Sequence, residues 1–251
     1  MRGGGIQILC VPGLPEVEKG EDLPALIAVA VRNANISFEQ NDILVVAQKI
    51  VSKSEGRVVL LSSAKPSKEA KELAAALKKD PRFIEIILRQ SRRIVRRVPV
   101  LIVETHHGFV CANAGVDRSN VPGRDAVALL PKDPDRSAKK LSAALRRRTG
   151  KRIAVIISDT FGRPWRLGLT NIAIGASGFR VLVDLRGQRD RHRKLLHATI
   201  LAVADELAAA AGLLMGKSAG TPVILIRGYR FRPANDRAAR IIRPPHEDLF
   251  R

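Results

Sequence analysis

The sequence predicts an α+β protein in which mixed sheets pack against helices. Short apolar runs typical of buried strands occur in mixed order with Ala-, Leu- and Lys-rich segments that carry apolar residues at helical spacing. A doubly wound fold would require strict alternation of strand and helix, which this order lacks. The chain has 251 residues, enough to bury a substantial core, and no internal repeat or flexible linker interrupts it.

The strands are predicted from apolar runs that end at turn residues. The first run stops at Pro12, Gly13, Leu14 and Pro15, which together have the composition of a turn. A turn at 106–108 separates two further runs. We expect strands at residues 6–11, 42–47, 100–104, 109–112, 152–158 and 222–226, and a polar loop that begins at Asp159.

The helices are predicted from apolar residues at helical spacing and from residues that favour helix ends. We expect helices at residues 22–32, 66–79, 83–97, 133–149 and 195–215, the third with a basic outer face. The clearest is 133–149, because Asp133 suits an N-cap, Pro134 a first helical position and Gly150 the position after the end. An Arg-rich tail closes the chain.

The composition is that of a globular cytoplasmic enzyme. Hydrophobic residues make up 45% and charged residues 27% of the chain. No apolar run reaches the roughly 18 residues that a membrane span requires, since Asp205 and Glu206 interrupt the longest one. The N-terminus lacks the apolar segment of a signal peptide. Cys10 and Cys111 are too few for a disulfide framework.

The net charge of +20 points to an anionic partner. None of the arginine clusters is interleaved with the aromatic residues on which single-stranded nucleic acid stacks, which disfavours nucleic acid. A polyanionic small-molecule substrate and a general arginine bias of the composition both remain open as explanations. The clusters lie at Arg92, Arg93, Arg96 and Arg97, at residues 146–148, and at Arg189, Arg191 and Arg193.

Two acidic segments that follow apolar strands are the strongest candidates for chemistry. Asp117 lies in NAGVDRSN (113–120), and Asp159 lies in SDTFGR (158–163). A carboxylate at a strand end, beside hydroxyl or amide side chains, suits Mg²⁺ or Mn²⁺, which take oxygen ligands. The alternative is that both aspartates only start turns.

Other polar residues give weaker signals. Lys49 and Lys53, four residues apart after the strand at 42–47, suit phosphate binding but equally suit a solvated surface. Arg163 and Arg166 suit an anionic ligand or a loop-closing ion pair near Asp159. Cys111 reads as a core residue and the 106–107 histidine pair as a turn, whereas the pair Asp205 and Glu206 suits a functional or a packing role.

Motifs along nearly the whole chain resemble those of coenzyme F420-0:L-glutamate ligases, the γ-glutamyl ligases of deazaflavin cofactor biosynthesis. The most specific are GFVCANAGVDRSNV (108–121) and VIISDTFGRPWRLG (155–168). The others are VPGLPEVEKGEDL (11–23), DILVVAQKIVSKSEGR (42–57), LLPKDPDRSAKKL (129–141), AIGASG (173–178), DLRGQRD (184–190), ADELAAAAGLLMGK (204–217) and RPPHEDLFR (243–251).

The resemblance implies a GTP-dependent ligase that adds L-glutamate, through a γ-linked amide, to the coenzyme F420-0 precursor. The nucleotide would phosphorylate the precursor's carboxylate, and the glutamate amine would then attack the acyl phosphate. Two divalent ions, Mg²⁺ or Mn²⁺, would neutralise phosphate charge, with K⁺ as a further candidate ion. The resemblance also implies an intertwined homodimer and a single ligase domain over 1–251, without the C-terminal flavin-binding reductase domain of some relatives.

Site residues follow from the resemblance position by position. Asp117 and Asp159 are the implied ligands of one metal and Thr160 of the second, and the same three residues are the implied catalytic set. The implied nucleotide contacts are Pro12, Gly13, Leu14, Pro15, Gln48, Lys49, Lys53, Asn120, Met215, Gly216 and Lys217.

Four residues depart from the family pattern. Leu169 and Asn171 stand where relatives commonly have Gln and Asp, His192 replaces a Gly, and Lys217 replaces an acidic or amide residue. These departures leave open an amide ligase of the same scaffold that acts on a different phosphorylated carboxylate. A basic nucleic-acid-binding protein is the other alternative.

Overall fold

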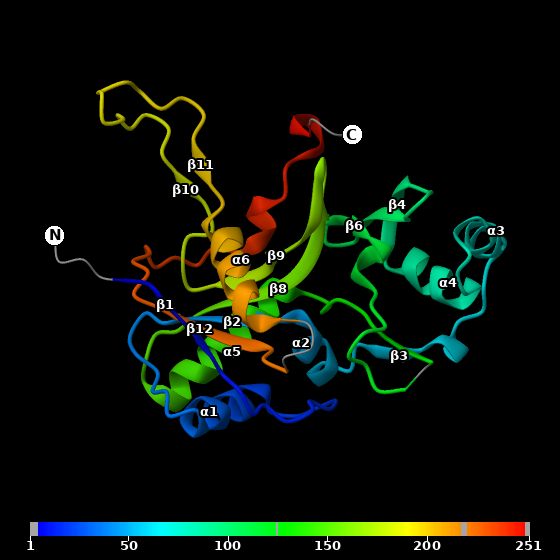
Figure 1. Ribbon diagram of the computed structural model, residues 1–251, viewed down its shortest axis with the longest axis horizontal. Coiled ribbons are helices and arrows are strands. Elements are labelled where there is room, and N and C mark those ends of the chain that lie inside the picture. The colour runs from blue at the N-terminus through cyan, green and yellow to red at the C-terminus, as the bar shows by residue number, and fades with distance from the viewer. Residues whose placement is uncertain (1–4, 124, 217–219, 249–251) are drawn as a thin grey trace.

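A five-stranded mixed sheet forms the centre of the computed structural model, which describes residues 5–123, 125–216 and 220–248 (Figure 1). Its strand order is β1 (Gln7–Cys10), β12 (Val223–Arg227), β2 (Ile43–Ala47), β8 (Ala154–Arg163), β9 (Arg166–Ser177). Strands β2 and β8 pair in parallel, and the other neighbours are antiparallel. Because the chain mixes parallel and antiparallel strands with helices in no strict alternation, the predicted α+β class is confirmed.

Helices cover both faces of this sheet, which explains why β2 is apolar throughout. Leu44 and Val46 pack under α1 (Leu23–Asn33), α2 (Gln48–Ser54) and α5 (Pro134–Thr149) on one face. Ile43 and Val45 pack under α6 (Val203–Met215) on the other. Since successive strand residues face opposite ways, a strand buried on both sides reads as a continuous apolar run.

The ends of α5 are as predicted. The Asp133 side chain accepts a hydrogen bond from the Arg136 backbone N–H at 2.9 Å, and Gly150 adopts a left-handed φ of 71° at the C-cap. The helix lies so close to β9 that a Cβ on Gly175 would be 2.4 Å from the Pro134 carbonyl oxygen. Glycine at 175 is therefore required by packing.

A second lobe is inserted between α2 and α5. It contains a two-stranded sheet of β3 (Val58–Leu60) and β7 (Ala126–Ala128), helices α3 (Lys68–Leu77) and α4 (Pro81–Arg89), and a three-stranded sheet of β4 (Ser91–Arg96), β5 (Ile102–Thr105) and β6 (Val110–Ala112). Its own core includes the fully buried Ile84, Ile87 and Leu101. Short 3-10 helices lie at Leu61–Ser63, Asn113–Gly115, Ala238–Ile241 and Pro245–Glu247.

Three predicted elements are corrected by the structure. The segment 83–97 is not one helix, because α4 ends at Arg89 and β4 pairs with β5 from Ser91. The helix predicted at 195–215 begins only at Val203, while β10 (Val183–Asp184) and β11 (Ile200–Leu201) form an arm that extends from the body in Figure 1. Asp159 begins no loop, because β8 continues to Arg163 in a long hairpin with β9.

The other predicted strands and helices are present with small shifts of their ends. No helix in the described part of the chain is long and apolar enough to cross a membrane.

Candidate active site

Most predicted site residues gather at one end of the central sheet. The carboxyl end of β2 lies beside the middle of the parallel strand β8, with Ala47 opposite Ser158. Helix α2 begins there, at Gln48, and Asp159 follows Ser158. The antiparallel strand β12 starts at the same end, since the Ala47 backbone N–H donates to the Pro222 carbonyl at 2.8 Å.

Strand β1 finishes at this same end of the sheet. The Val11 backbone N–H donates to the Val223 carbonyl at 3.1 Å, so the loop of Pro12, Gly13, Leu14 and Pro15 emerges beside the start of β12. Leu14 is half-buried against the core, whereas the other three residues are exposed. The sheet thus brings together segments that are up to about two hundred residues apart in sequence.

Lys49 and Asp117 form the charged centre of this region. The Lys49 ammonium donates to Asp117 Oδ2 at 2.8 Å, to the Ser119 carbonyl at 2.7 Å and to Ser119 Oγ at 2.9 Å. Asp117 also accepts from the backbone N–H of Ser119 at 2.8 Å and from its hydroxyl at 2.7 Å. Burial opposes the charged form of Asp117, but the bonds from Lys49 and Ser119 outweigh it and lower the pKa of the carboxyl.

The turn-starting role that the sequence left open for Asp117 is present, because its Oδ1 accepts from the Ser119 N–H. Its other carboxylate oxygen accepts from the Lys49 ammonium, and its role as a metal ligand stays a prediction. Asn120 follows in the same segment, is exposed, and has a left-handed φ of 53°. Ser119 was not predicted as a site residue, and its position two residues after an aspartate was the only signal.

Lys53 is not a solvated surface lysine. It is only 8% exposed, and its ammonium pairs with Glu16, which follows the Pro12–Pro15 loop in sequence. Gln48, on the same helix, is 2% exposed and accepts from the Ser52 hydroxyl at 2.9 Å. Helix α2 thus carries three buried polar side chains, Gln48, Ser52 and Lys53, an arrangement that costs free energy unless the polar atoms have hydrogen-bond or ion-pair partners. Glu16 was missed, because nothing local marks it as a partner of Lys53.

Asp159 and Thr160 lie on opposite faces of β8, because they are neighbours in a strand. Asp159 lies near Cys111: burial, and then the negative charge of Asp159, raise the pKa of that thiol to about 12. Thr160 faces α6, where its hydroxyl donates to Asn171 Oδ1 at 3.3 Å. Asn171 in turn donates to Ser158 Oγ at 3.4 Å and contacts Met215 Sδ at 3.6 Å.

The end of α6 closes the site on this second face. Met215 is buried, and Gly216 is the C-cap residue with φ 54°. The Thr221 hydroxyl donates to the carbonyls of Leu214 and Met215 at 3.0 and 2.9 Å. Lys217 lies outside the described residues.

Oxygen atoms of the kind that a hard divalent cation takes are present at this end of the sheet. Asp159 and Thr160 offer theirs on opposite faces of β8, so the two residues would not bind the same ion, and Asp117 accepts from the Lys49 ammonium. Within the described residues no three His, Cys, Asp or Glu side chains gather around one point, so protein carboxylates alone would not complete the coordination of an ion. Magnesium characteristically uses one or two carboxylates together with phosphate oxygens and water.

Two cavities of about 650 and 630 Å³ lie elsewhere and include none of Asp117, Asp159 and Thr160. The candidate site is therefore defined by converging charges and not by either cavity.

Several other candidates have structural roles. Cys111 is buried and its raised pKa makes it a poor nucleophile, as predicted. His107 Nε2 lies 3.0 Å from the Pro131 carbonyl oxygen, in the predicted turn. Asp205 accepts from the Ala173 N–H at 2.9 Å and ties α6 to β9. Arg163 and Arg166 are opposite each other in the β8–β9 register at the tip of the hairpin. Both are four or more residues from Asp159 in sequence.

Cations and carboxylates gathered with hydroxyls at the end of a sheet are typical of a site that binds an anionic, oxygen-rich ligand. Comparison with known proteins narrows this class. The family model of F420-0:gamma-glutamyl ligase matches residues 13–228. The chain belongs to this family, and it is a ligase.

Similar curated proteins span the whole chain. The coenzyme F420:L-glutamate ligase of Methanothermobacter thermautotrophicus is 45% identical, with 98% of this chain and 99% of the relative covered. The ligase of the same name from Methanopyrus kandleri is 46% identical, with 99% of this chain and 100% of the relative covered. The ligase of Archaeoglobus fulgidus is 40% identical, with 98% of this chain and 96% of the relative covered.

Proposed function

We propose that this ligase uses GTP to join L-glutamate, through its amine, to the terminal carboxylate of the coenzyme F420-0 precursor. The family and the names of its relatives support the substrate pair. The observation that carries the proposal in this chain is the Lys49–Asp117–Ser119 cluster, at the end of the sheet where the segments predicted to contact the nucleotide lie. Nucleotide and metal use rest on the resemblance and on the oxygen-rich donor set.

Amide formation requires an activated carboxylate. In the proposed first step a carboxylate oxygen of the precursor attacks the γ-phosphorus of GTP, the bond to the β-phosphate oxygen breaks, and GDP leaves. In the second step the glutamate nitrogen attacks the acyl carbon, phosphate leaves, and the nitrogen loses a proton. The product is the amide between the precursor's carboxylate and the glutamate nitrogen, and a second round on the γ-carboxylate of that glutamate would give the γ-linked amide.

The roles of the chain's residues follow from their charges. Lys49 and Lys53 would bind phosphate oxygens, exchanging their present carboxylate partners for the nucleotide. Asp117 and Asp159 would hold one divalent ion, and Thr160 would bind the second from the other face of β8. Such ions, when bound, neutralise charge on the transferred phosphoryl group.

The test is a mass-spectrometric assay of purified protein with F420-0, L-glutamate, GTP and Mg²⁺ or Mn²⁺. We expect the acceptor mass to rise by one or more glutamyl units, only when metal is present. Asp159→Asn should lose activity on the order of 100-fold or more while remaining folded by circular dichroism. Glu85→Gln, which changes a carboxylate on α4, is the matched control and should keep full activity. ATP in place of GTP measures the base preference.

The alternative acceptor is tested by the same assay. Asn171 and the exposed Leu169, the two departures from the family pattern in the hairpin, motivate it. Folded, nucleotide-binding protein that leaves F420-0 unchanged would reject the proposed acceptor and favour a different carboxylate.

A further inference from the structure

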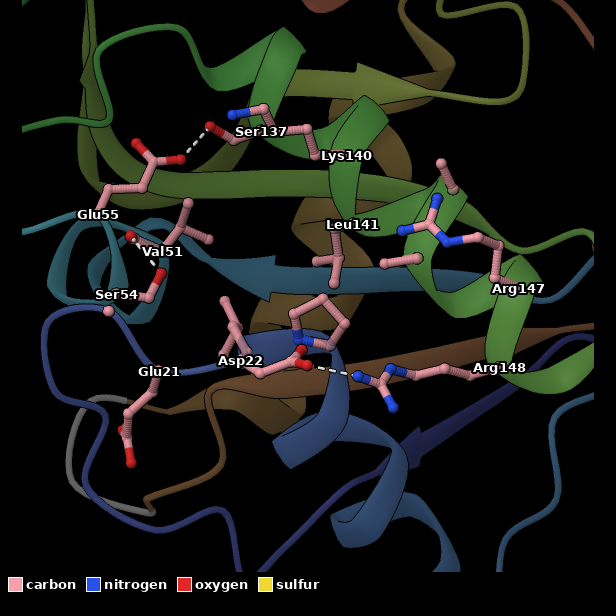
Figure 2. A pocket seen from close by; sticks show the side chains of 15 residues that line it. Glu21, Asp22, Val51, Ser54, Glu55, Ser137, Lys140, Leu141, Arg147 and Arg148 are labelled. Atoms are coloured by element: carbon pink, nitrogen blue, oxygen red, sulfur yellow. Dashed lines mark hydrogen bonds and ion pairs between the residues drawn. The ribbon is translucent and has the colours of Figure 1, made fainter.

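A pocket of about 650 Å³ lies between α1, α2 and α5, outside the candidate active site (Figure 2). One stripe of α5 forms its longest wall, with residues three or four positions apart. The stripe consists of Ser137, Lys140, Leu141, Ala144, Arg147 and Arg148. The loop at 20–22, the start of α1 and the last turn of α2 form the remaining walls.

The carboxylates of this pocket already have partners. Glu55 accepts a hydrogen bond from the Ser137 hydroxyl. Asp22 caps α1 by accepting from the Ala25 N–H at 3.0 Å and pairs with Arg148, as the dashed line in Figure 2 shows. Glu21 lines the pocket as well, and its carboxylate accepts from the Glu18 N–H at 2.7 Å.

Two cationic side chains of the pocket, unlike its carboxylates, have no partner among the described residues. Within the described residues, the side chains of Lys140 and Arg147 have no hydrogen-bond or ion-pair partner. In Figure 2 the Lys140 side chain runs along α5 toward Ser137, and the Arg147 guanidinium lies on the other side of Leu141 along the helix. Leu23, Val51 and Leu141 supply a buried apolar floor, each 5% exposed or less. The pocket therefore offers a ligand two unpaired cationic side chains and a buried apolar floor.

We propose that this pocket binds a small anion with an apolar body, such as an aromatic or branched carboxylate, phosphate or sulfonate. Lys140 and Arg147 would bind the anionic group, and Leu23, Val51 and Leu141 would contact the apolar part. The pocket volume lies within the range of about 300–1,000 Å³ that small-molecule sites occupy. The net charge of +20 favours entry of an anion.

The pocket shares two segments with the candidate active site, so ligand binding is coupled to that site. Helix α2 presents Val51 to the pocket and carries Lys53. The loop that forms another wall is tied to α2 by the Gly20 N–H, which donates to the Ser54 carbonyl at 2.9 Å, and by the pair of Glu16 with Lys53. A ligand that moves this wall changes the position of Lys53. By thermodynamic linkage, a change in the position of Lys53 also changes the affinity of the pocket for its ligand.

The first experiment titrates the purified protein with 8-anilinonaphthalene-1-sulfonate, an anion with an aromatic body, and follows its fluorescence. We expect one saturable site. Arg147→Gln should weaken binding about tenfold, because it removes a charged hydrogen-bond donor. Ala144→Phe, at a half-exposed position of the pocket wall, should abolish binding by filling the space.

Lys139→Gln is the matched control, since it removes the neighbouring lysine, which lines the other large cavity. Its affinity for the probe should equal that of the unchanged protein. Equal affinity in Arg147→Gln and Ala144→Phe, with melting temperatures maintained, would overturn the proposed site. Equal weakening by Lys139→Gln and Arg147→Gln would also overturn it, because binding would then follow total charge.

The coupling is tested by Lys53→Gln, which breaks the pair with Glu16 but does not line the pocket. The affinity for the probe should change at least about fivefold. Unchanged affinity in the folded variant would overturn the coupling. Neither experiment depends on ligase activity, so failure here is distinguishable from failure of the proposed function.

Discussion

At the scale of single residues, the site depends on hydrogen bonds that hold charges in place. Asp117 is half-buried, yet donors from Lys49 and Ser119 keep its carboxylate ionised. A carboxyl whose pKa is lower in the folded than in the unfolded chain stabilises the fold above its unfolded pKa. This contribution disappears as the pH falls through the folded pKa.

The stability that Asp117 provides should therefore depend on pH. Asp117→Asn should lower the free energy of unfolding at pH 7, and the difference from the unchanged protein should shrink below about pH 4, the range in which an unfolded aspartate is protonated. Urea denaturation of both proteins at pH 7, 5 and 3.5 measures this. A difference that stays constant across this range would contradict the assigned hydrogen bonds.

Asn171 is a positioning residue for Thr160. Its amide accepts from the Thr160 hydroxyl and donates to Ser158, and α6 approaches so closely that a Cβ on Gly212 would lie 3.0 Å from Asn171 Cγ. Because Thr160 is a proposed metal ligand, Asn171→Ala should raise the metal concentration for half-maximal activity about tenfold, the effect of losing a group that orients such a ligand.

Asn171→Asp provides the matched comparison, because a carboxylate accepts the same hydrogen bond. It should retain metal dependence close to that of the unchanged protein. Equal metal dependence in all three proteins would show that Thr160 needs no such partner.

At the scale of elements, α5 is connected to β9 and to the C-terminal segment by one side chain. Asp135 accepts from the backbone N–H groups of Ala176 at 2.8 Å, Ala238 at 2.7 Å and Ala239 at 3.2 Å. Asp135→Ala would leave these donors unpaired, at a cost of about 1–3 kcal/mol. Denaturant unfolding should show this loss, with a smaller one for Asp135→Asn, which keeps an acceptor. Unchanged stability of Asp135→Ala would show that water replaces the carboxylate.

The wrongly predicted helix at 83–97 has an explanation at this scale. Apolar residues in the segment fit helical spacing up to Arg89, and beyond it Ile94 and Val95 fit either spacing. Pairing with β5 decided the outcome, helped by the ion pair of Arg93 with Glu104 at 2.7 Å. A distant strand partner of this kind leaves no local signal in the sequence.

At the scale of the whole molecule, the net charge of +20 produces self-repulsion in the folded state. Raising the NaCl concentration from low to physiological values should therefore raise the melting temperature, by about 2–4 °C for each kcal/mol of repulsion screened. Calorimetry measures the shift. KCl at equal ionic strength should act alike, and a melting temperature that falls with salt would mean that attractive ion pairs dominate.

Much of this protein was determined by the sequence itself. The continuous apolar run of β2 predicts a strand covered on both faces, and Asp133, Pro134 and Gly150 set the ends of α5, because these are local properties of backbone and side chains. The motifs around Asp117 and Asp159 identified the family.

Only the tertiary structure decided which of these residues meet. The register of β2 with β8 brings the start of α2 beside Asp159, and the inserted lobe returns Asp117 to Lys49 across 68 positions of sequence. The burial of Lys53 and its pairing with Glu16 are likewise tertiary contacts. Asp159 and Thr160 point in opposite directions because β8 continues through both as a strand paired with β9. Strand pairing is a long-range interaction whose partners are selected by the packing of the whole core, and a local pattern carries no record of that choice.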